Sequence, residues 1–331
     1  MKRFLPFFVL PLALFAADAQ HPFNGSIERL DPSFDEIIAP DAKVEKLAEG
    51  FNWSEGPTWF QDSVVFSDVP ENVIYQWKPG ATSATVFLKP SGLLNPTPGF
   101  REQGSNGLGV DPEGRLLVCQ HGERRIARWS KDKGFESIAD RFEGKRFNSP
   151  NDLALLKSGE IYFTDPPYGF EGLNNSPLKE IEWNGVYRVT ADGKVSLIVK
   201  DISFPNGIGF SPDEKILYVA VSDGKQPRVM AYDVQTDGSA TNGRVFFDAT
   251  PLKSSTRKGS CDGLKVDARG NVFATGPGGV LVINPTGKHL GTILTNEATG
   301  NCAWGDGGST LYITADMFLC RVKTSTKGAG L

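Results

Sequence analysis

The sequence predicts an all-β protein made of six repeated sheets, and three observations predict it. The 331 residues are rich in turn formers, with 37 Gly and 22 Pro, and they include 22 Phe. No long stretch carries the 3.6-residue periodicity of a surface helix. A motif made of an oxygen-bearing residue, an apolar run, a turn and a second apolar run occurs six times. Together these features indicate many short strands that repeat as sheets.

The first segment, residues 1–19, is expected to be a signal peptide. Lys2 and Arg3 precede an apolar run of about 14 residues, and Ala17 and Ala19 have the small-x-small spacing of a cleavage site. A transmembrane anchor is the alternative, but a span needs about 20 apolar residues, and no later segment could span either. We therefore expect a periplasmic or secreted protein without membrane contact after cleavage.

The rest of the chain, residues 20–331, is expected to form a single domain, in which residues 20 to about 45 close the repeat array or pack against it. Its 39% hydrophobic and 22% charged residues are ordinary for a soluble globular protein. Loss of residues 1–19 changes the formal charge from −4 to −5, which argues against a nucleic-acid partner. The sequence leaves a monomer and a weak dimer both open.

The six copies superpose without gaps, and their starts are separated by 51, 45, 55, 56 and 39 residues. This spacing matches the four-stranded blade of a β-propeller, so the chain predicts a six-bladed β-propeller. A solenoid would need a shorter and more regular repeat, and a β-sandwich would not repeat six times in one register. The copies are EGPTWFQDSVVFSD from Glu55, NGLGVDPEGRLLVCQ from Asn106, NDLALLKSGEIYFTD from Asn151, NGIGFSPDEKILYVA from Asn206, DGLKVDARGNVFATG from Asp262 and NCAWGDGGSTLYITA from Asn301.

The first residues of the copies are expected to form a ring at one mouth of the central channel, because the innermost strand of each blade lines that channel. Turn chemistry is the alternative explanation, since Asn, Asp and Gly are common in turns. Glu55 is not a turn former and still occupies the same position, which favours the ring. The ring comprises Glu55, Asn106, Asn151, Asn206, Asp262 and Asn301.

This set of oxygen atoms predicts a site for a hard divalent cation at the mouth. Without a cation, the converging carboxylates of Glu55 and Asp262 would repel each other. Calcium suits flexible oxygen coordination, and magnesium or manganese would fit with more retained water. Zinc is disfavoured because the chain has only three His residues.

The four cysteines leave two interpretations open. An even number in an exported protein allows a disulfide, and four cysteines permit three pairings. The alternative is that they are small buried strand residues, because LLVCQH and MFLCRV place Cys119 and Cys320 inside apolar runs.

A series of longer motifs runs in order from about Glu55 to the end of the chain: SEGPTW, NGLGVDPEGRLLVCQHGERR, FNSPNDLAL, YFTDPPYG, FPNGIGFSPDEKILYV, CDGLKVDARGNVF and GPGGVLVINP. Through these motifs the chain resembles the gluconolactonase and senescence-marker-protein-30 (regucalcin) family of six-bladed propellers. The resemblance implies that Glu55, Asn206 and Asp262 ligate a metal, that Asn151 completes the ligand shell or binds substrate, and that Asp262 is also the catalytic base. Cys302 stands where the family usually has glycine, so Asn301 is not expected to be a ligand.

The activity that follows from the resemblance is metal-dependent hydrolysis of a sugar lactone, such as glucono-1,5-lactone, to the sugar acid by a lactonase. The cation would polarise the ester carbonyl while Asp262 takes a proton from the attacking water. A carboxylate bound to a cation is a weakened base, so attack by metal-bound hydroxide is an alternative. Two other functions remain: a calcium-dependent phosphotriesterase or arylesterase, and a non-catalytic binding propeller.

Three further residues are candidates for substrate contact. Asn106 belongs to the predicted ring. His121, in CQHGERR, follows the second strand of its blade and could reach the mouth, although a lone His is more often structural. Tyr168, in the loop DPPYG, could line the substrate entrance.

Overall fold

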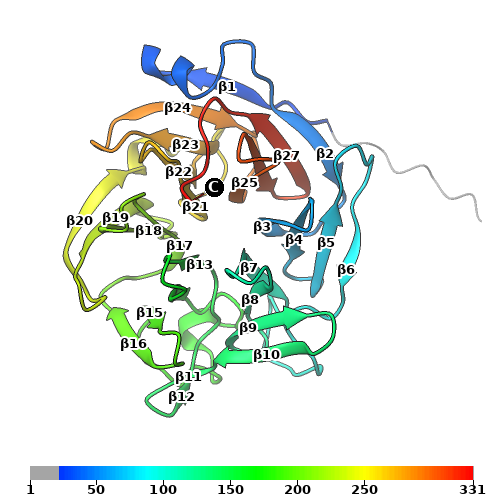
Figure 1. The fold of residues 1–331 in the computed structure, drawn as a ribbon, viewed down its shortest axis with the longest axis vertical. Coiled ribbons are helices and arrows are strands. Elements are labelled where there is room, and N and C mark those ends of the chain that lie inside the picture. Colours follow the sequence, from blue (N-terminus) through cyan, green and yellow to red (C-terminus); the bar gives the residue numbers. More distant parts are fainter. Residues whose placement is uncertain (1–21, 331) are drawn as a thin grey trace, which may run out of the picture.

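Six antiparallel sheets surround a central channel in the computed structural model, which describes residues 22–330 (Figure 1). The predicted all-β, six-bladed propeller is therefore confirmed. The predicted signal peptide, residues 1–19, lies outside the described residues. Within residues 22–330 the helices are short 3-10 turns, and none has the length and apolar character that crossing a bilayer requires.

Blades 1 to 4 and blade 6 consist of four strands each and blade 5 of five, and the first strand of each repeat lies innermost. Blade 1 contains β3 (Ser54–Phe60), β4 (Ser63–Asp68), β5 (Val73–Trp77) and β6 (Thr85–Leu88), and blade 2 contains β7 (Ser105–Val110), β8 (Leu116–Gln120), β9 (Arg125–Ser130) and β10 (Gly134–Ala139). Blade 3 contains β13 (Leu153–Leu155), β14 (Ile161–Asp165), β15 (Gly185–Val189) and β16 (Val195–Val199), and blade 4 contains β17 (Pro205–Phe210), β18 (Ile216–Val221), β19 (Arg228–Val234) and β20 (Ala240–Asp248).

Blades 5 and 6 also take up the N-terminal segment, which closes the ring as expected (Figure 1). Blade 5 contains β21 (Leu264–Val266), β22 (Val272–Gly276), β23 (Gly279–Ile283) and β24 (His289–Leu294), and blade 6 contains β25 (Thr299–Gly305), β26 (Thr310–Ala315) and β27 (Phe318–Lys323). Strand β1 (Ser26–Arg29) pairs with β24 at the outer edge of blade 5, and β2 (Glu45–Glu49) pairs with β27 as the outermost strand of blade 6. Outside the blades lie the hairpin β11 (Arg141–Phe142) and β12 (Lys145–Arg146), and the 3-10 turns η1 (Pro32–Glu36), η2 (Leu173–Asn175) and η3 (Thr250–Leu252).

The hydrophobic core is divided among the six interfaces between neighbouring blades. A cluster between blades 5 and 6 contains Phe34, Phe273 and Phe318, and the cluster between blades 6 and 1 contains Trp77 and Tyr312. The second strand of a blade is covered on both faces, which explains why β4, β8 and β26 are buried along their whole length. Burial of apolar area at every interface therefore holds the ring together.

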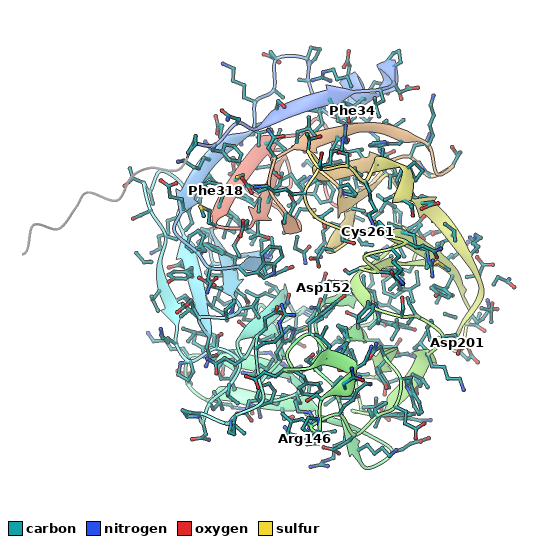
Figure 2. All side chains as sticks on the ribbon, turned by 180° about the vertical axis from the view of Figure 1, so that it is seen from behind. Phe34, Arg146, Asp152, Asp201, Cys261 and Phe318 are labelled. Carbon is teal, nitrogen blue, oxygen red and sulfur yellow. The ribbon has the colours of Figure 1, made fainter. Side chains whose placement is uncertain are left out.

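The four cysteines are buried free thiols, so the interpretation as small buried residues is the one that the structure supports. Cys302 and Cys320 belong to the cluster between blades 5 and 6. Figure 2 labels Cys261 and Asp152 near the middle of the molecule, whereas Arg146 and Asp201 lie at its periphery.

Candidate functional site

The first residues of the six copies lie at the N-terminal ends of the innermost strands, so they meet at one end of the channel. Glu55, Asn106 and Asn206 are each the second residue of their strands β3, β7 and β17. Asn151 and Asp262 each lie two residues before β13 and β21. The predicted ring at one mouth is therefore a consequence of the common register of the repeats.

A β-bulge at the start of the inner strand accompanies the ring position in blades 1, 2 and 4. In blade 1 the strand β3 has one more residue than β4 between the pairs Glu55 with Ser67 and Thr58 with Val65. The same shift occurs in β7 and in β17. A bulge interrupts the alternation of side chains and re-aims them. In blade 1 it includes Gly56, whose φ of 51° is a left-handed conformation that glycine adopts without strain.

Contacts between neighbouring blades fix the backbone of the ring. The Gly107 N–H donates to the Asn151 carbonyl at 2.7 Å, and the Gly207 N–H donates to the Asp262 carbonyl at 2.9 Å. A Cβ atom on residue 207 would lie only 2.4 Å from that carbonyl oxygen. The glycine after the ring residue is therefore needed for close approach of the blades, a role beyond the turn chemistry that its sequence context indicates.

These residues line a cavity of about 300 Å³ at the mouth. All four predicted metal ligands contribute to it, and so do Asn106 and Tyr168. The Tyr168 ring stacks on Phe204 with 5.9 Å between centroids. The lining consists of Trp53, Glu55, Arg101, Glu102, Asn106, Asn151, Tyr168, Asn206, Ser222 and Asp262.

Several oxygen atoms in the cavity wall are buried without a hydrogen-bond partner among the described residues. They are the Oδ1 atoms of Asn106, Asn151 and Asp262. A third amide is oriented by its neighbour, because the Asn206 Nδ2 donates to the Ser222 Oγ at 3.0 Å and the Asn206 Oδ1 remains as an acceptor. An unpaired buried polar group costs about 1–3 kcal/mol, so such a concentration indicates a ligand site.

The two carboxyl groups of the ring are strongly perturbed. Burial raises the pKa of Glu55 to about 8, and the charge of Asp152 adds to this, although the Gly56 N–H donates to the Glu55 Oε2 at 2.7 Å and opposes the shift. Desolvation and then the charge of Glu55 raise the pKa of Asp262 well above its usual range. A bound cation would reverse both effects because it favours the ionised forms.

The donor set fits a hard divalent cation: two carboxylates, from Glu55 and Asp262, and two amide oxygens, from Asn151 and Asn206. Within residues 22–330 no group of three or more His, Cys, Asp or Glu side chains is arranged to hold a metal ion. The cation site at the channel mouth thus stays a prediction, based on mixed carboxylate and amide ligands.

The side chain of Asn301, the ring residue of blade 6, makes hydrogen bonds within the protein through both its oxygen and its nitrogen. Its Oδ1 accepts the Cys302 N–H at 2.9 Å, and its Nδ2 donates to the Asp152 Oδ2 at 3.1 Å. The amide oxygen of Asn301 thus already accepts one hydrogen bond, and the exclusion of Asn301 from the ligand set stays a prediction.

His121 lies behind the cavity wall and is not part of its lining. It is fully buried, and its Nδ1–H donates to the Glu102 carbonyl at 3.2 Å. Burial lowers the pKa of His121 to about 4, so the ring is neutral near pH 7. Contact between His121 and a substrate stays a prediction; in the structure the ring supports the loop that carries Glu102.

Sequence comparison of the copies missed four residues of the lining: Trp53, Arg101, Glu102 and Ser222. Arg101 and Glu102 lie in the loop before β7 and form an ion pair at 2.5 Å. They precede the second copy, so alignment of the repeats could not reveal them. The signal available in the sequence was two adjacent charges four and five residues before a ring position, within GFREQGSN.

Comparison with known proteins identifies the family of the chain. Residues 53–316 match the sequence model of the family described as SMP-30/Gluconolactonase/LRE-like region. A gluconolactonase from Zymomonas mobilis subsp. mobilis is 40% identical over 331 residues, with 95% of this chain and 91% of that protein covered. The lactonase drp35 of Staphylococcus aureus is 30% identical over 191 residues, covering 56% of this chain and 55% of that protein.

Solved structures share the fold. The structure of a gluconolactonase from Xanthomonas campestris superposes with a TM-score of 0.77 at 29% identity, covering 92% of this chain and 98% of that one. A calcium-binding protein, regucalcin, from Agrobacterium tumefaciens has a TM-score of 0.65 at 21% identity, covering 87% and 95% of the two chains. At that identity the second likeness concerns the fold alone.

Proposed function

Because the chain belongs to the SMP-30/gluconolactonase/LRE-like family, we propose that it is a lactonase that hydrolyses a sugar lactone, glucono-1,5-lactone or a close analogue, to the sugar acid with the help of a divalent cation. The observation that carries the proposal is the set of unpaired amide and carboxylate oxygens in one cavity at the channel mouth. The volume of this cavity, about 300 Å³, suits one small sugar ring.

In this proposal Glu55, Asn151, Asn206 and Asp262 hold the cation, with calcium the best match to their oxygen atoms and magnesium or manganese as alternatives. When bound, the cation would orient the lactone and polarise its carbonyl as a Lewis acid. Family membership and the donor set support the choice of ligands, because the resemblance implies these four positions and their side chains line one cavity.

Asp262 acts as the general base. Its carboxylate accepts a proton from a water molecule, whose oxygen attacks the lactone carbonyl carbon. The bond between that carbon and the ring oxygen then breaks, and the protonated Asp262 returns its proton to the ring oxygen, which becomes a hydroxyl group of the open sugar acid. The unpaired Oδ1 of Asp262 supports this role, since it is free to accept a hydrogen bond from water.

The remaining lining residues orient the sugar. Asn106 has a free Oδ1 that can accept a hydrogen bond from a sugar hydroxyl. Arg101 and Glu102 provide donors and acceptors at the rim, and the Tyr168 ring, stacked on Phe204, provides a flat apolar wall. Such a mixture of polar atoms and an aromatic face suits a polyhydroxylated ring.

One panel of substrates tests the proposal. Purified protein is assayed with sugar lactones, an aryl ester and a phosphotriester, each with and without a chelator. Hydrolysis of a sugar lactone that is lost with chelator and restored by calcium is the expected result. Preference for the phosphotriester would favour the alternative hydrolase function, and the absence of turnover with binding of a lactone would favour a non-catalytic propeller.

A further inference from the structure

Two positions in the repeats each carry a charge in one copy only. The residue directly after the ring residue is small or uncharged in five copies. The residue three positions after the ring residue is also uncharged in five copies. The exceptions are Asp152 in the third copy and Lys265 in the fifth. The five partners of Asp152 are Gly56, Gly107, Gly207, Gly263 and Cys302, and those of Lys265 are Thr58, Gly109, Ala154, Gly209 and Trp304.

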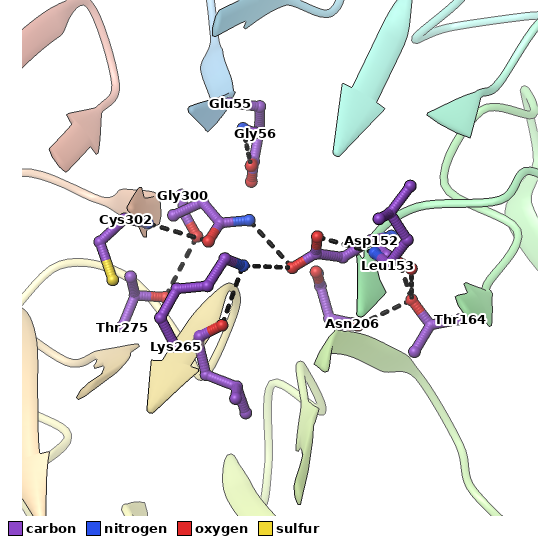
Figure 3. A network of polar contacts seen from close by, with 12 residues as sticks. Glu55, Gly56, Asp152, Leu153, Thr164, Asn206, Lys265, Thr275, Gly300 and Cys302 are labelled. Carbon is purple, nitrogen blue, oxygen red and sulfur yellow. Dashed lines mark hydrogen bonds and ion pairs between the residues drawn. The ribbon is translucent and has the colours of Figure 1, made fainter. Parts of the chain in front are cut away.

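The fold brings these two exceptions together inside the channel, although they belong to different blades (Figure 3). The Lys265 Nζ lies 3.5 Å from the Asp152 Oδ2 and also donates to the Leu264 carbonyl at 3.0 Å. Asp152 is 1% exposed and accepts further hydrogen bonds from the Asn301 amide and, at 2.8 Å, from the Leu153 N–H. The pair is thus held by blades 3, 5 and 6 at once.

The ion pair lies beside the ring. Asp152 directly follows the ring residue Asn151, and its Oδ1 lies against Gly107, the glycine that follows the ring residue Asn106. Lys265 also lines a second opening, of about 400 Å³, which is mainly apolar. Its side chain is 26% exposed, so the ammonium keeps part of its hydration while its charge faces Asp152.

We propose that Asp152 and Lys265 are positioning residues that set the charge of the channel so that its mouth takes one divalent cation. With all groups ionised, the carboxylates of Glu55, Asp262 and Asp152 and the ammonium of Lys265 leave two negative charges. At the rim Glu102 is offset by its ion pair with Arg101. The two positive charges of a divalent cation neutralise the two negative charges that remain in the channel. The inference rests on the proposed function, because it concerns the same cation site.

The test measures calcium affinity by titration calorimetry on chelator-stripped protein. The variant K265M makes the channel one charge more negative, and D152N makes it one charge less negative. The double variant K265M/D152N restores the wild-type channel charge. We expect K265M to bind calcium about tenfold tighter and D152N about tenfold weaker, or about 1.4 kcal/mol each way. The double variant should lie within about threefold of the wild type.

A second measurement compares the affinities for La³⁺ and Ca²⁺ in the same protein. The fraction of folded protein affects both affinities equally, so it cancels in their ratio. The electrostatic effect scales with ion charge, so the La³⁺ to Ca²⁺ affinity ratio should rise about threefold in K265M and fall about threefold in D152N. K265R keeps the charge and should behave as wild type. K215M is the matched control, since it removes the same charge from an ion pair whose lysine side chain is 79% exposed.

Opposite shifts in the two single variants support the inference, whereas equal weakening, or no change, in both would overturn it and leave the pair a structural element. Thermal melts of the stripped proteins accompany the titrations. If K265M does not fold, K265Q replaces it, and failure of both to fold also rejects the inference. A wild-type protein that binds no divalent cation would instead refute the cation in the proposed function itself.

Discussion

Asp262→Asn separates the catalytic role of Asp262 from its role in holding the cation. The substitution keeps an oxygen ligand and nearly the same shape, and the Oδ1 of Asp262 has no hydrogen-bond partner among the described residues that the change would disrupt. Loss of a general base costs about 100-fold or more in rate, or about 2.7 kcal/mol at 1.36 kcal/mol per factor of ten. We expect this loss in lactone hydrolysis, measured by proton release, with only a moderate fall in calcium affinity.

Glu55→Gln is the matched control because it removes the same unit of charge from the same cavity. If Asp262 is the base, saturating calcium should restore the activity of Glu55→Gln and leave Asp262→Asn inactive. If both carboxylates only hold the cation, the two variants should lose activity together and regain it together. Hydrolysis by Asp262→Asn near the wild-type rate, with its metal site shown to be full, would refute the assignment of the base.

Three other predictions concern stability and processing. Gly207→Ala should lower the free energy of unfolding by about 1–3 kcal/mol in urea titrations, because the new Cβ would lie 2.4 Å from the Asp262 carbonyl oxygen. The control Gly224→Ala, whose Cβ would have no atom within 4 Å, should change the free energy of unfolding by less than about 0.5 kcal/mol. Equal effects of the two substitutions would contradict the packing argument. The pKa of His121 is lowered from 6.5 to about 4 in the folded state, so between these pH values the folded state binds fewer protons than the unfolded state. As pH falls from 6.5 to 4, the wild type should therefore lose stability relative to His121→Gln, by at most about 1.4 kcal/mol per pH unit. Parallel curves of unfolding free energy against pH for the two proteins would count against this prediction. We also propose cleavage after Ala19, and an intact mass that retains residues 1–19 in protein recovered from outside the cytoplasm would disprove it.

The number of blades and most of the site could be predicted from the sequence, because both follow from a repeated local pattern. Alternating apolar residues and turn formers define each strand, and the gapless register assigns the same position to Glu55, Asn151 and Asp262. Once the ring closes, equal positions in the repeats reach the same end of the channel. The register could not reveal Arg101 and Glu102, since the loop that carries them lies outside the repeat.

The sequence by itself thus determined the fold, the ring and the family, whereas the tertiary structure decided what each polar side chain does there. Only the folded chain turns the Asn301 oxygen toward the Cys302 N–H, buries His121 behind the cavity wall, and brings Lys265 to Asp152 across 113 residues of sequence. The physical reason is that strand and turn formation depend on neighbouring residues, while hydrogen bonds and ion pairs inside the channel depend on distances between blades. Those distances exist only after the N-terminal strands have closed the ring.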